Sequence, residues 1–249
     1  MTARGARFDR VMGFSIGALN GSALAFGRLD DALARWRRLD WTAIRPRPRL
    51  FPFSLCSTEP LRAFLDHAAD EEEAKARLAA ELTIVTACPA DGAPVNATYA
   101  PGGSAWDGPL VEHAAASCAI PAVFPPVDLV YRGRALRLVD GGVPMRRPLD
   151  FSPLAASADV LVLEMVRADE VGLRFWTPWR SVEQACRVAA RRLVDDGIRP
   201  LPRVLRLAPS KRLEPLMLDF RSAGISRMLA QGAADAEAFL AAPESYRVR

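Results

Sequence analysis

Histidine and lysine are scarce in this sequence of 249 residues. Only His67, His113, Lys75 and Lys211 occur, so nearly all of the 33 basic side chains are arginines. The four cysteines stand far apart without a Cys-x-x-Cys pair, and with two histidines no metal-ligand spacing exists. We therefore expect no metal and no organic cofactor, and we interpret the cysteines as reduced thiols of a cytosolic protein.

Long apolar runs and clusters of basic residues are also absent. No run approaches the roughly 18 to 20 apolar residues of a membrane-spanning helix. The formal charge of +4 at pH 7 comes from scattered arginines, so nucleic acid is not an expected partner. Half of the residues are apolar and a quarter are charged, which is typical of a globular protein. The length suits one sizeable core, so we expect a single domain over residues 1–249.

The segment from Arg10 to Gly21 combines a short strand, a sharp turn and a helix of small and apolar residues. Ser15 lies at the turn, with Gly13 and Gly17 two positions before and after it. A tight strand-to-helix turn exposes the serine hydroxyl and crowds the backbone around it, which the Gly-x-Ser-x-Gly pattern permits. The positive N-terminal end of the following helix favours an oxyanion there. The pattern therefore predicts a nucleophile elbow.

Segments of strand character alternate with segments of helical periodicity along the whole chain. The strands that matter most are expected at residues 8–14, 81–87, 95–100, 128–131, 135–139, 159–166 and 203–207. Helices are expected at residues 15–26, 30–39, 61–69, 71–80, 109–117, 182–193 and 222–240. The proline-rich and arginine-rich segment 45–52 is expected to be a loop. The alternation predicts an α/β fold of three layers, with a mostly parallel sheet and helices on both faces.

A serine nucleophile needs a base, and Asp140 is the candidate. A Ser-His-Asp triad in the usual order requires a histidine after the acidic residue, whereas both histidines precede Asp140. Asp140 ends a strand of alternating character and is followed by Gly141 and Gly142, which let the backbone turn sharply. Functional sites gather at the carboxyl ends of strands in α/β sheets. An ordinary Asp-Gly hairpin turn is the alternative interpretation.

Three segments together resemble the patatin-like phospholipases, which are serine hydrolases with a Ser-Asp dyad. The matching segments are the elbow at residues 13–20, the run from Ala116 to Pro126, and Val139-Asp140-Gly141-Gly142-Val143-Pro144. The resemblance is firm over residues 8–150 and looser beyond. It implies a patatin-like fold in which Ser15 forms an acyl-enzyme and Asp140 accepts its proton. It also implies that the backbone N–H of Ile16 is one oxyanion donor.

The beginning of the chain departs from the family pattern. Members normally carry a Gly-rich loop before the elbow strand, and this loop supplies most of the oxyanion hole. Only seven residues precede Phe8, so we expect a domain truncated at its N-terminus and an impaired activity of this chain. A smaller departure is Arg146-Arg147-Pro148, where many members have asparagine before the proline.

The resulting hypothesis is a lipid acyl hydrolase of the phospholipase A type with a Ser15-Asp140 dyad. Its partners are a lipid or acyl-ester substrate and, as an open option, the surface of a membrane. Two alternatives stay open: a catalytically impaired lipid-binding or scaffolding relative, and a thioesterase or small-ester hydrolase. Basic residues before the apolar stretch 11–26 resemble a signal peptide, but Asn20 and Ser22 interrupt it, so a cytoplasmic location is expected.

Overall fold

The chain folds into two compact units. The computed structural model describes residues 1, 4–38, 46–50, 53–143, 149–170, 178–213 and 222–248. The elbow unit consists of Phe8–Arg38 and Thr42–Asp150. The C-terminal unit consists of Met1–Arg7, Leu39–Trp41 and Phe151–Arg249. Whether these two units form the single domain expected over residues 1–249 stays a prediction.

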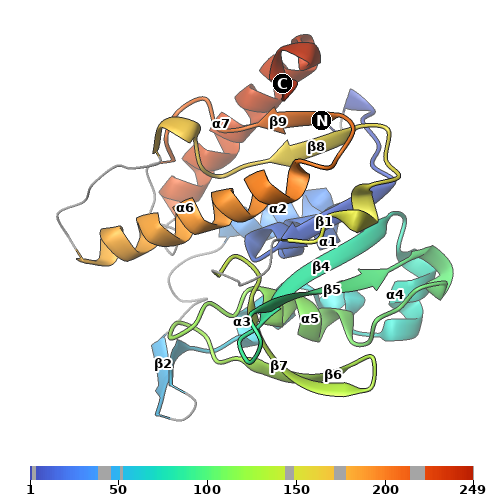
Figure 1. Ribbon diagram of the computed structural model, residues 1–249, viewed down its shortest axis with the longest axis vertical. Helices are drawn as coiled ribbons and strands as arrows, with labels where there is room; N and C mark the ends of the chain where they lie inside the picture. The colour runs from blue at the N-terminus through green and yellow to red at the C-terminus, as the bar shows by residue number, and fades with distance from the viewer. Residues whose placement is uncertain are drawn as a thin grey trace. The chain divides into compact units, whose positions relative to one another are not determined.

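The sheet of the elbow unit is mixed. It contains β1 (Arg10–Phe14), β4 (Glu81–Cys88), β5 (Ala93–Tyr99), β6 (Val127–Tyr131) and β7 (Arg134–Asp140) (Figure 1). The α/β, patatin-like fold class is confirmed. However, only β1 pairs with β4 in parallel, so the expected mostly parallel sheet is wrong here. The β4–β5 and β6–β7 connections are too short for a crossover, and short connections join antiparallel strands.

Strand β4 is the centre of this sheet. Strand β5 pairs along one edge of β4, from Leu82 to Cys88. The opposite edge is shared, because β1 pairs with Glu81–Val85 and β7 pairs with Thr86 and Ala87. Since β1 is parallel to β4 and β7 is antiparallel, the carboxyl ends of β1 and β7 approach each other end to end.

Helices of small residues cover one face of this sheet. They are α1 (Ile16–Ala25) and α5 (Leu110–Ser117), which share a core with side chains of β4 and β5. Leu19, Leu82 and Tyr99 are fully buried in that core. A Cβ on Gly21 of α1 would lie 3.0 Å from Val11, so glycine keeps the helix close to β1. The unit also contains α2 (Leu29–Arg38), α3 (Glu59–Phe64) and α4 (Glu71–Arg77).

A two-stranded hairpin replaces the loop that was expected over residues 45–52. It pairs β2 (Pro46–Arg49) with β3 (Ser54–Cys56) in antiparallel fashion. The prediction of a loop was wrong for residues 46–49, while residues 45, 51 and 52 lie outside the described residues. Proline disfavours helical backbone in the preceding residue, so the alternating Arg-Pro sequence favours an extended chain, and an edge strand tolerates proline.

The C-terminal unit has helices on both faces of a parallel strand pair. Strands β8 (Val160–Leu163) and β9 (Val204–Leu207) lie between α6 (Pro178–Ile198) and α7 (Ser222–Ala241) (Figure 1). Val160 and Val204 pack with Ile198 of α6. On the opposite face, Leu205 and Leu207 of β9 pack with Phe239 of α7. Five short 3₁₀ helices complete the described chain: Asp66–Ala68, Pro101–Gly103, Ser152–Leu154, Ala168–Glu170 and Pro243–Tyr246.

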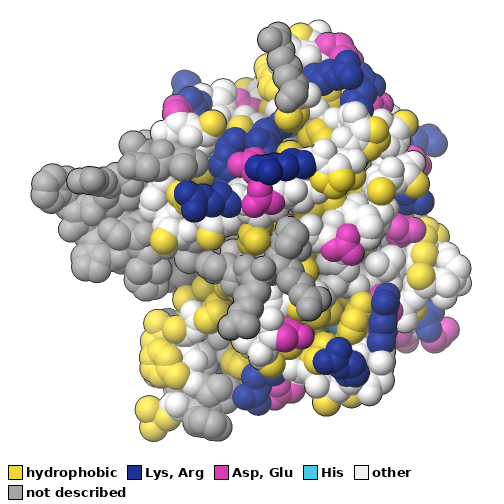
Figure 2. Space-filling view, in the orientation of Figure 1, with side chains coloured by type: hydrophobic (Ala, Val, Ile, Leu, Met, Phe, Trp, Pro, Cys, Tyr) yellow, Lys and Arg dark blue, Asp and Glu magenta, His cyan; other side chains and the backbone are white. Residues whose placement is uncertain are grey.

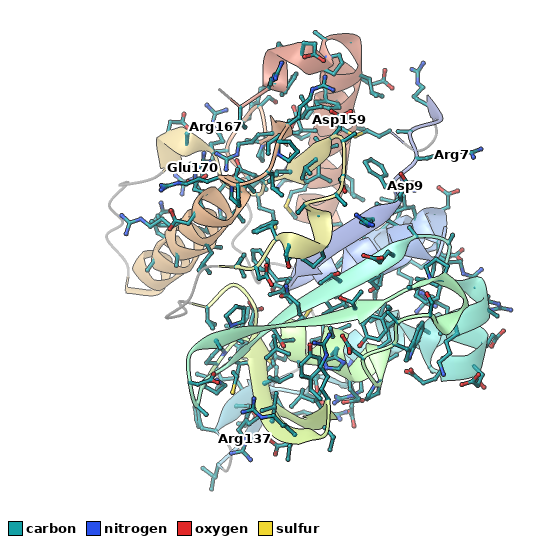
Figure 3. All side chains as sticks on the ribbon, turned by 45° about the vertical axis from the view of Figure 1, so that its right-hand side comes forward. Arg7, Asp9, Arg137, Asp159, Arg167 and Glu170 are labelled. Atoms are coloured by element: carbon teal, nitrogen blue, oxygen red, sulfur yellow. The ribbon has the colours of Figure 1, made fainter. Side chains whose placement is uncertain are left out.

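Buried ion pairs follow the carboxyl end of β8. Glu164 lies 3.2 Å from Arg191 of α6 and 3.3 Å from Arg206 of β9. Glu170 lies 3.5 Å from Arg187, and its carboxylate also accepts the backbone N–H of Arg167. Figure 3 labels Arg167 and Glu170 at this end of the unit. Burial raises the pKa of Glu164 despite the two nearby arginines.

No helix among the described residues is long and apolar enough to cross a bilayer.

Candidate active site

The turn after β1 holds Ser15 in a strained backbone conformation. Its φ is 53° and its ψ is −132°, a region that residues with side chains rarely adopt. A Cβ on Gly13 would lie 2.4 Å from the carbonyl oxygen of Gly17, so only glycine fits there. The second glycine differs, because a Cβ on Gly17 would have no described atom within 4 Å. Gly13 therefore permits the turn, while Gly17 leaves open space in the first turn of α1.

A buried serine fastens the elbow to β4. The Oγ atom of Ser117 accepts the backbone N–H of Ser15 at 2.9 Å and donates to the carbonyl oxygen of Val85 at 2.6 Å. Ser117 ends α5 and is fully buried. Sequence reasoning missed this residue. Its signal was present, because Ser117 lies in the Ala116–Pro126 segment that carried part of the family resemblance.

Asp140 is the last residue of β7, and the turn that follows it packs against Phe14 of β1. Its backbone N–H donates to the carbonyl oxygen of Ala119 at 3.0 Å, and its Oδ1 accepts the N–H of Gly142 at 2.7 Å. A Cβ on Gly141 would lie 2.8 Å from the Phe14 Cβ and 2.4 Å from a β4 carbonyl oxygen. A Cβ on Gly142 would lie 3.0 Å from the Phe14 ring. Gly141 is therefore needed to bring Asp140 beside the elbow, and Gly142 leaves room for the Phe14 ring.

The carboxyl group of Asp140 is buried and tuned by its neighbours. Burial raises its pKa from 3.8 to about 6, and hydrogen bonding by Ser15 and Gly142 opposes that rise. Its Oδ2 atom is buried and has no partner at ordinary hydrogen-bond distance among the described residues. The Ser15 hydroxyl lowers the pKa of this carboxyl and so lies near it, without forming a hydrogen bond of ordinary geometry to Oδ2. Catalytic hydrogen bonds are often long before substrate binds.

Other ionisable side chains of the elbow unit are poor candidates for the chemistry. Burial, and then the Asp140 charge, raises the pKa of the Cys118 thiol well above its usual value, so it stays a neutral thiol. His113 is fully buried and its Nδ1 lies 2.6 Å from the Tyr99 hydroxyl. Burial lowers its pKa to about 4. His67 packs edge-on against Phe26, at 5.2 Å between ring centroids. Both histidines pack among aromatic rings.

The start of α1 is the region where an oxyanion can be stabilised. The N–H of Ser15 is occupied by Ser117, whereas the first N–H groups of a helix have no partner within that helix. The helix begins at Ile16, so its N–H points from the positive end of α1. The role of Ile16 as an oxyanion donor stays a prediction. In the described parts of the chain, no group of three acidic, histidine or cysteine side chains could hold a metal ion.

Comparison with known proteins identifies the family. A family model described as patatin-like phospholipase matches residues 1–151, which is more than half of the chain. The chain belongs to the patatin-like phospholipase family. A comparison with curated proteins gave no match. Patatin-like phospholipases are generally hydrolases that act on lipids. The matched range contains Ser15, Asp140 and all four glycines of the two turns, while Arg146-Arg147-Pro148 lies outside the described residues.

Proposed function

We propose that this chain hydrolyses carboxylic esters of lipids in the manner of a phospholipase A, with Ser15 as nucleophile and Asp140 as base. One observation carries the proposal. A serine on a strained strand-to-helix turn lies beside a buried carboxyl whose pKa is raised to about 6, so the carboxylate is present and basic at neutral pH. The proposed location is the cytoplasm, where the substrate is presented at the surface of a membrane.

The proposed reaction has two steps. In the first, the Ser15 oxygen attacks the ester carbonyl carbon, the carboxylate of Asp140 takes the hydroxyl proton, and the alcohol of the ester leaves with that proton. This gives an acyl-enzyme on Ser15. In the second, Asp140 removes a proton from water, which attacks the acyl carbon, and the fatty acid leaves while Ser15 regains its proton. The N–H of Ile16 stabilises the oxyanion of both tetrahedral intermediates.

Covalent labelling tests the nucleophile. A fluorophosphonate probe forms a stable bond to an activated serine, and intact mass reports the addition. We expect a single addition to the wild-type chain, none to Ser15→Ala, and strongly reduced addition to Asp140→Asn. The matched control is Ser104→Ala, an exposed serine of the same unit. Labelling that persists in Ser15→Ala would overturn the proposal.

The same experiment separates the alternative functions. A well-folded wild-type chain that resists labelling but binds fatty acyl ligands would be a lipid-binding or scaffolding relative. Labelling with hydrolysis restricted to thioesters or short esters would assign a thioesterase or small-ester hydrolase. Turnover that rises with acyl chain length supports the lipid hydrolase.

A further inference from the structure

The β2–β3 hairpin exposes large apolar side chains. Leu50 is 94% exposed, Phe53 is 57% exposed and Leu55 is 41% exposed. Figure 2 shows hydrophobic side chains gathered at the end of this hairpin, which lies at an edge of the elbow unit in Figure 1. Neighbouring apolar side chains that are this exposed mark an interaction surface more often than a solvent-facing one. Leu50, Phe53 and Leu55 are called the apolar tip below.

Three arginines and no acidic residue lie between Asp40 and Glu59, the part of the sequence that contains the apolar tip. They are Arg45, Arg47 and Arg49. Arg47 contacts Glu59 at 3.0 Å, but both side chains are more than two-thirds exposed, so this pair is weak and easily exchanged. Apolar side chains flanked by arginines suit the interface of an anionic bilayer, where apolar groups enter the acyl boundary and arginines meet phosphates.

The hairpin is hydrogen-bonded to the segment that holds Asp140. The N–H of Leu55 donates to the carbonyl oxygen of Ala122 at 3.1 Å, and the N–H of Cys56 donates to that of Val123 at 2.8 Å. A few residues earlier, the carbonyl oxygen of Ala119 accepts the N–H of Asp140. One short stretch of chain therefore fixes both the hairpin and the proposed base.

We propose that the apolar tip docks the elbow unit onto an anionic lipid surface. Leu50 and Phe53 enter the acyl boundary, and Arg47 lies at the phosphate level. This inference rests on the proposed function, because a lipid hydrolase meets its substrate at such a surface. Pairing of two hairpins from two copies is disfavoured, since the stretch from Trp41 to Thr58 of each copy carries arginines and no acidic residue, so like charges would meet.

Flotation with lipid vesicles tests the docking. The wild-type chain is compared on vesicles of phosphatidylcholine alone and on vesicles that also contain phosphatidylglycerol, and we expect tighter binding to the second. The double variant Leu50→Ser with Phe53→Ser should weaken binding to anionic vesicles by about tenfold or more. The matched control is Val130→Ser on β6, an apolar side chain that is 60% exposed in the same unit.

A second pair of variants tests the charge. Arg47→Gln should weaken binding to anionic vesicles about fivefold, since one basic side chain near the surface contributes about that factor. Arg134→Gln, an exposed arginine on β7, is the control and should leave binding unchanged. Thermal unfolding of each variant checks its fold. Should the double variant lose its transition, Leu50→Ser alone gives the same readout from a side chain almost free of contacts.

Hydrolysis of a water-soluble short-chain ester separates this inference from the proposed function. Lost vesicle binding with an unchanged soluble-ester rate supports the docking. Vesicle binding that is unchanged in the double variant overturns it, even where the soluble ester is cleaved and the proposed function stands. Hairpin-dependent vesicle binding without any hydrolysis supports the docking and overturns the proposed function instead. Light scattering that shows a dimer only in the wild type, with unchanged vesicle binding, assigns the apolar tip to a second copy and overturns the lipid.

Discussion

At the residue scale, the carboxyl group of Asp140 meets two opposing requirements. Burial makes it a stronger base by raising its pKa to about 6, and the same burial makes its charged form costly to the fold. The N–H of Gly142 offsets part of that cost by donating to Oδ1. The residue is thus suited to accept a proton at the expense of local stability.

The pH dependence of hydrolysis follows from this carboxyl. Because the base must be ionised, kcat/KM on a soluble ester should rise with pH through about 6 and level off above it. The measurement is a rate profile from pH 4 to pH 9. A profile that is already flat at pH 4 would contradict Asp140 as the base, since an ordinary aspartate ionises near that pH.

The substitution Asp140→Asn should raise the stability of the fold at neutral pH although it lowers the activity. The folded pKa of about 6 exceeds the unfolded value of 3.8, so the folded wild type loses stability as pH rises through this window, by about 3 kcal/mol in full. Asn carries no charge and keeps an acceptor for Gly142. Urea unfolding should find the variant more stable at pH 8 and close to wild type below pH 4.

Asp128→Asn is the control for that comparison. Asp128 is exposed, and a hydrogen bond from Arg137 lowers its pKa, so its charge is favourable in the fold. Figure 3 labels Arg137 on β7. The Asn variant should therefore gain no stability at pH 8. An equal gain in both variants would point to net charge rather than to the burial of Asp140.

Ser117 makes a separate prediction at this scale. Ser117→Ala removes the acceptor of the Ser15 N–H and the hydroxyl that donates to the carbonyl oxygen of Val85, which should cost about 1–3 kcal/mol of stability. Because the elbow turn is then less well fixed, kcat should fall while KM changes little. Ser104→Ala is the control. A rise in KM with unchanged kcat would mean that Ser117 shapes the binding surface instead of the position of the nucleophile.

At the scale of elements, the two glycines of the elbow separate turn from helix. Gly13→Ala places its Cβ 2.4 Å from a backbone oxygen, so overpacking should destabilise the fold by about 1–3 kcal/mol and remove labelling of Ser15. Gly17→Ala lies within α1 against open space, so the higher helix propensity of alanine should stabilise it by up to about 1 kcal/mol. Thermal unfolding of both variants makes the comparison, and equal effects would contradict it.

Elements were predictable where one local pattern decides them. The β-rich run of β4 and the Gly-x-Ser-x-Gly turn before α1 lie close to their expected positions. The hairpin at Pro46–Arg49 was not predictable as a strand pair, because its prolines also favour loops and its bonds to Ala122 and Val123 involve residues far along the chain. The role of Ser117 was not predictable for the same reason, since its hydrogen-bond partners, Ser15 and Val85, lie far from it in the sequence.

At the scale of the whole molecule, charge links the chain to its proposed substrate. The chain carries a formal charge of +4, almost all of its basic residues are arginines, and the stretch beside the apolar tip has only positive charge. Screening shortens electrostatic reach from about 10 Å at 0.1 M salt to about 3 Å at 1 M. Hydrolysis of anionic vesicles should therefore fall with added salt, while hydrolysis of a soluble neutral ester stays constant. A parallel fall of both rates would argue against electrostatic docking.

The overall class was predictable and the strand directions were not. Alternation of strand and helix patterns indicated an α/β protein, which the fold and the family confirm. The position of Asp140 relative to Ser15 needed β7 to run against β4, and this pairing involves only Thr86 and Ala87. No composition shift marks the division near residue 150, so the two compact units could not be read from the sequence.

The shared edge of β4 bears on how this fold can change. Both β1 and β7 pair with β4, so this one strand sets the distance between Ser15 and Asp140, which lie far apart in the chain. The segment 26–80 and the turn 89–92 can then be lengthened, shortened or exchanged with little effect on the spacing of Ser15 and Asp140, whereas Ser117 and Ala119 must be kept because they are hydrogen-bonded to these two residues. Recombination of those segments is a route to new acyl and head-group preferences that keeps the chemistry in place.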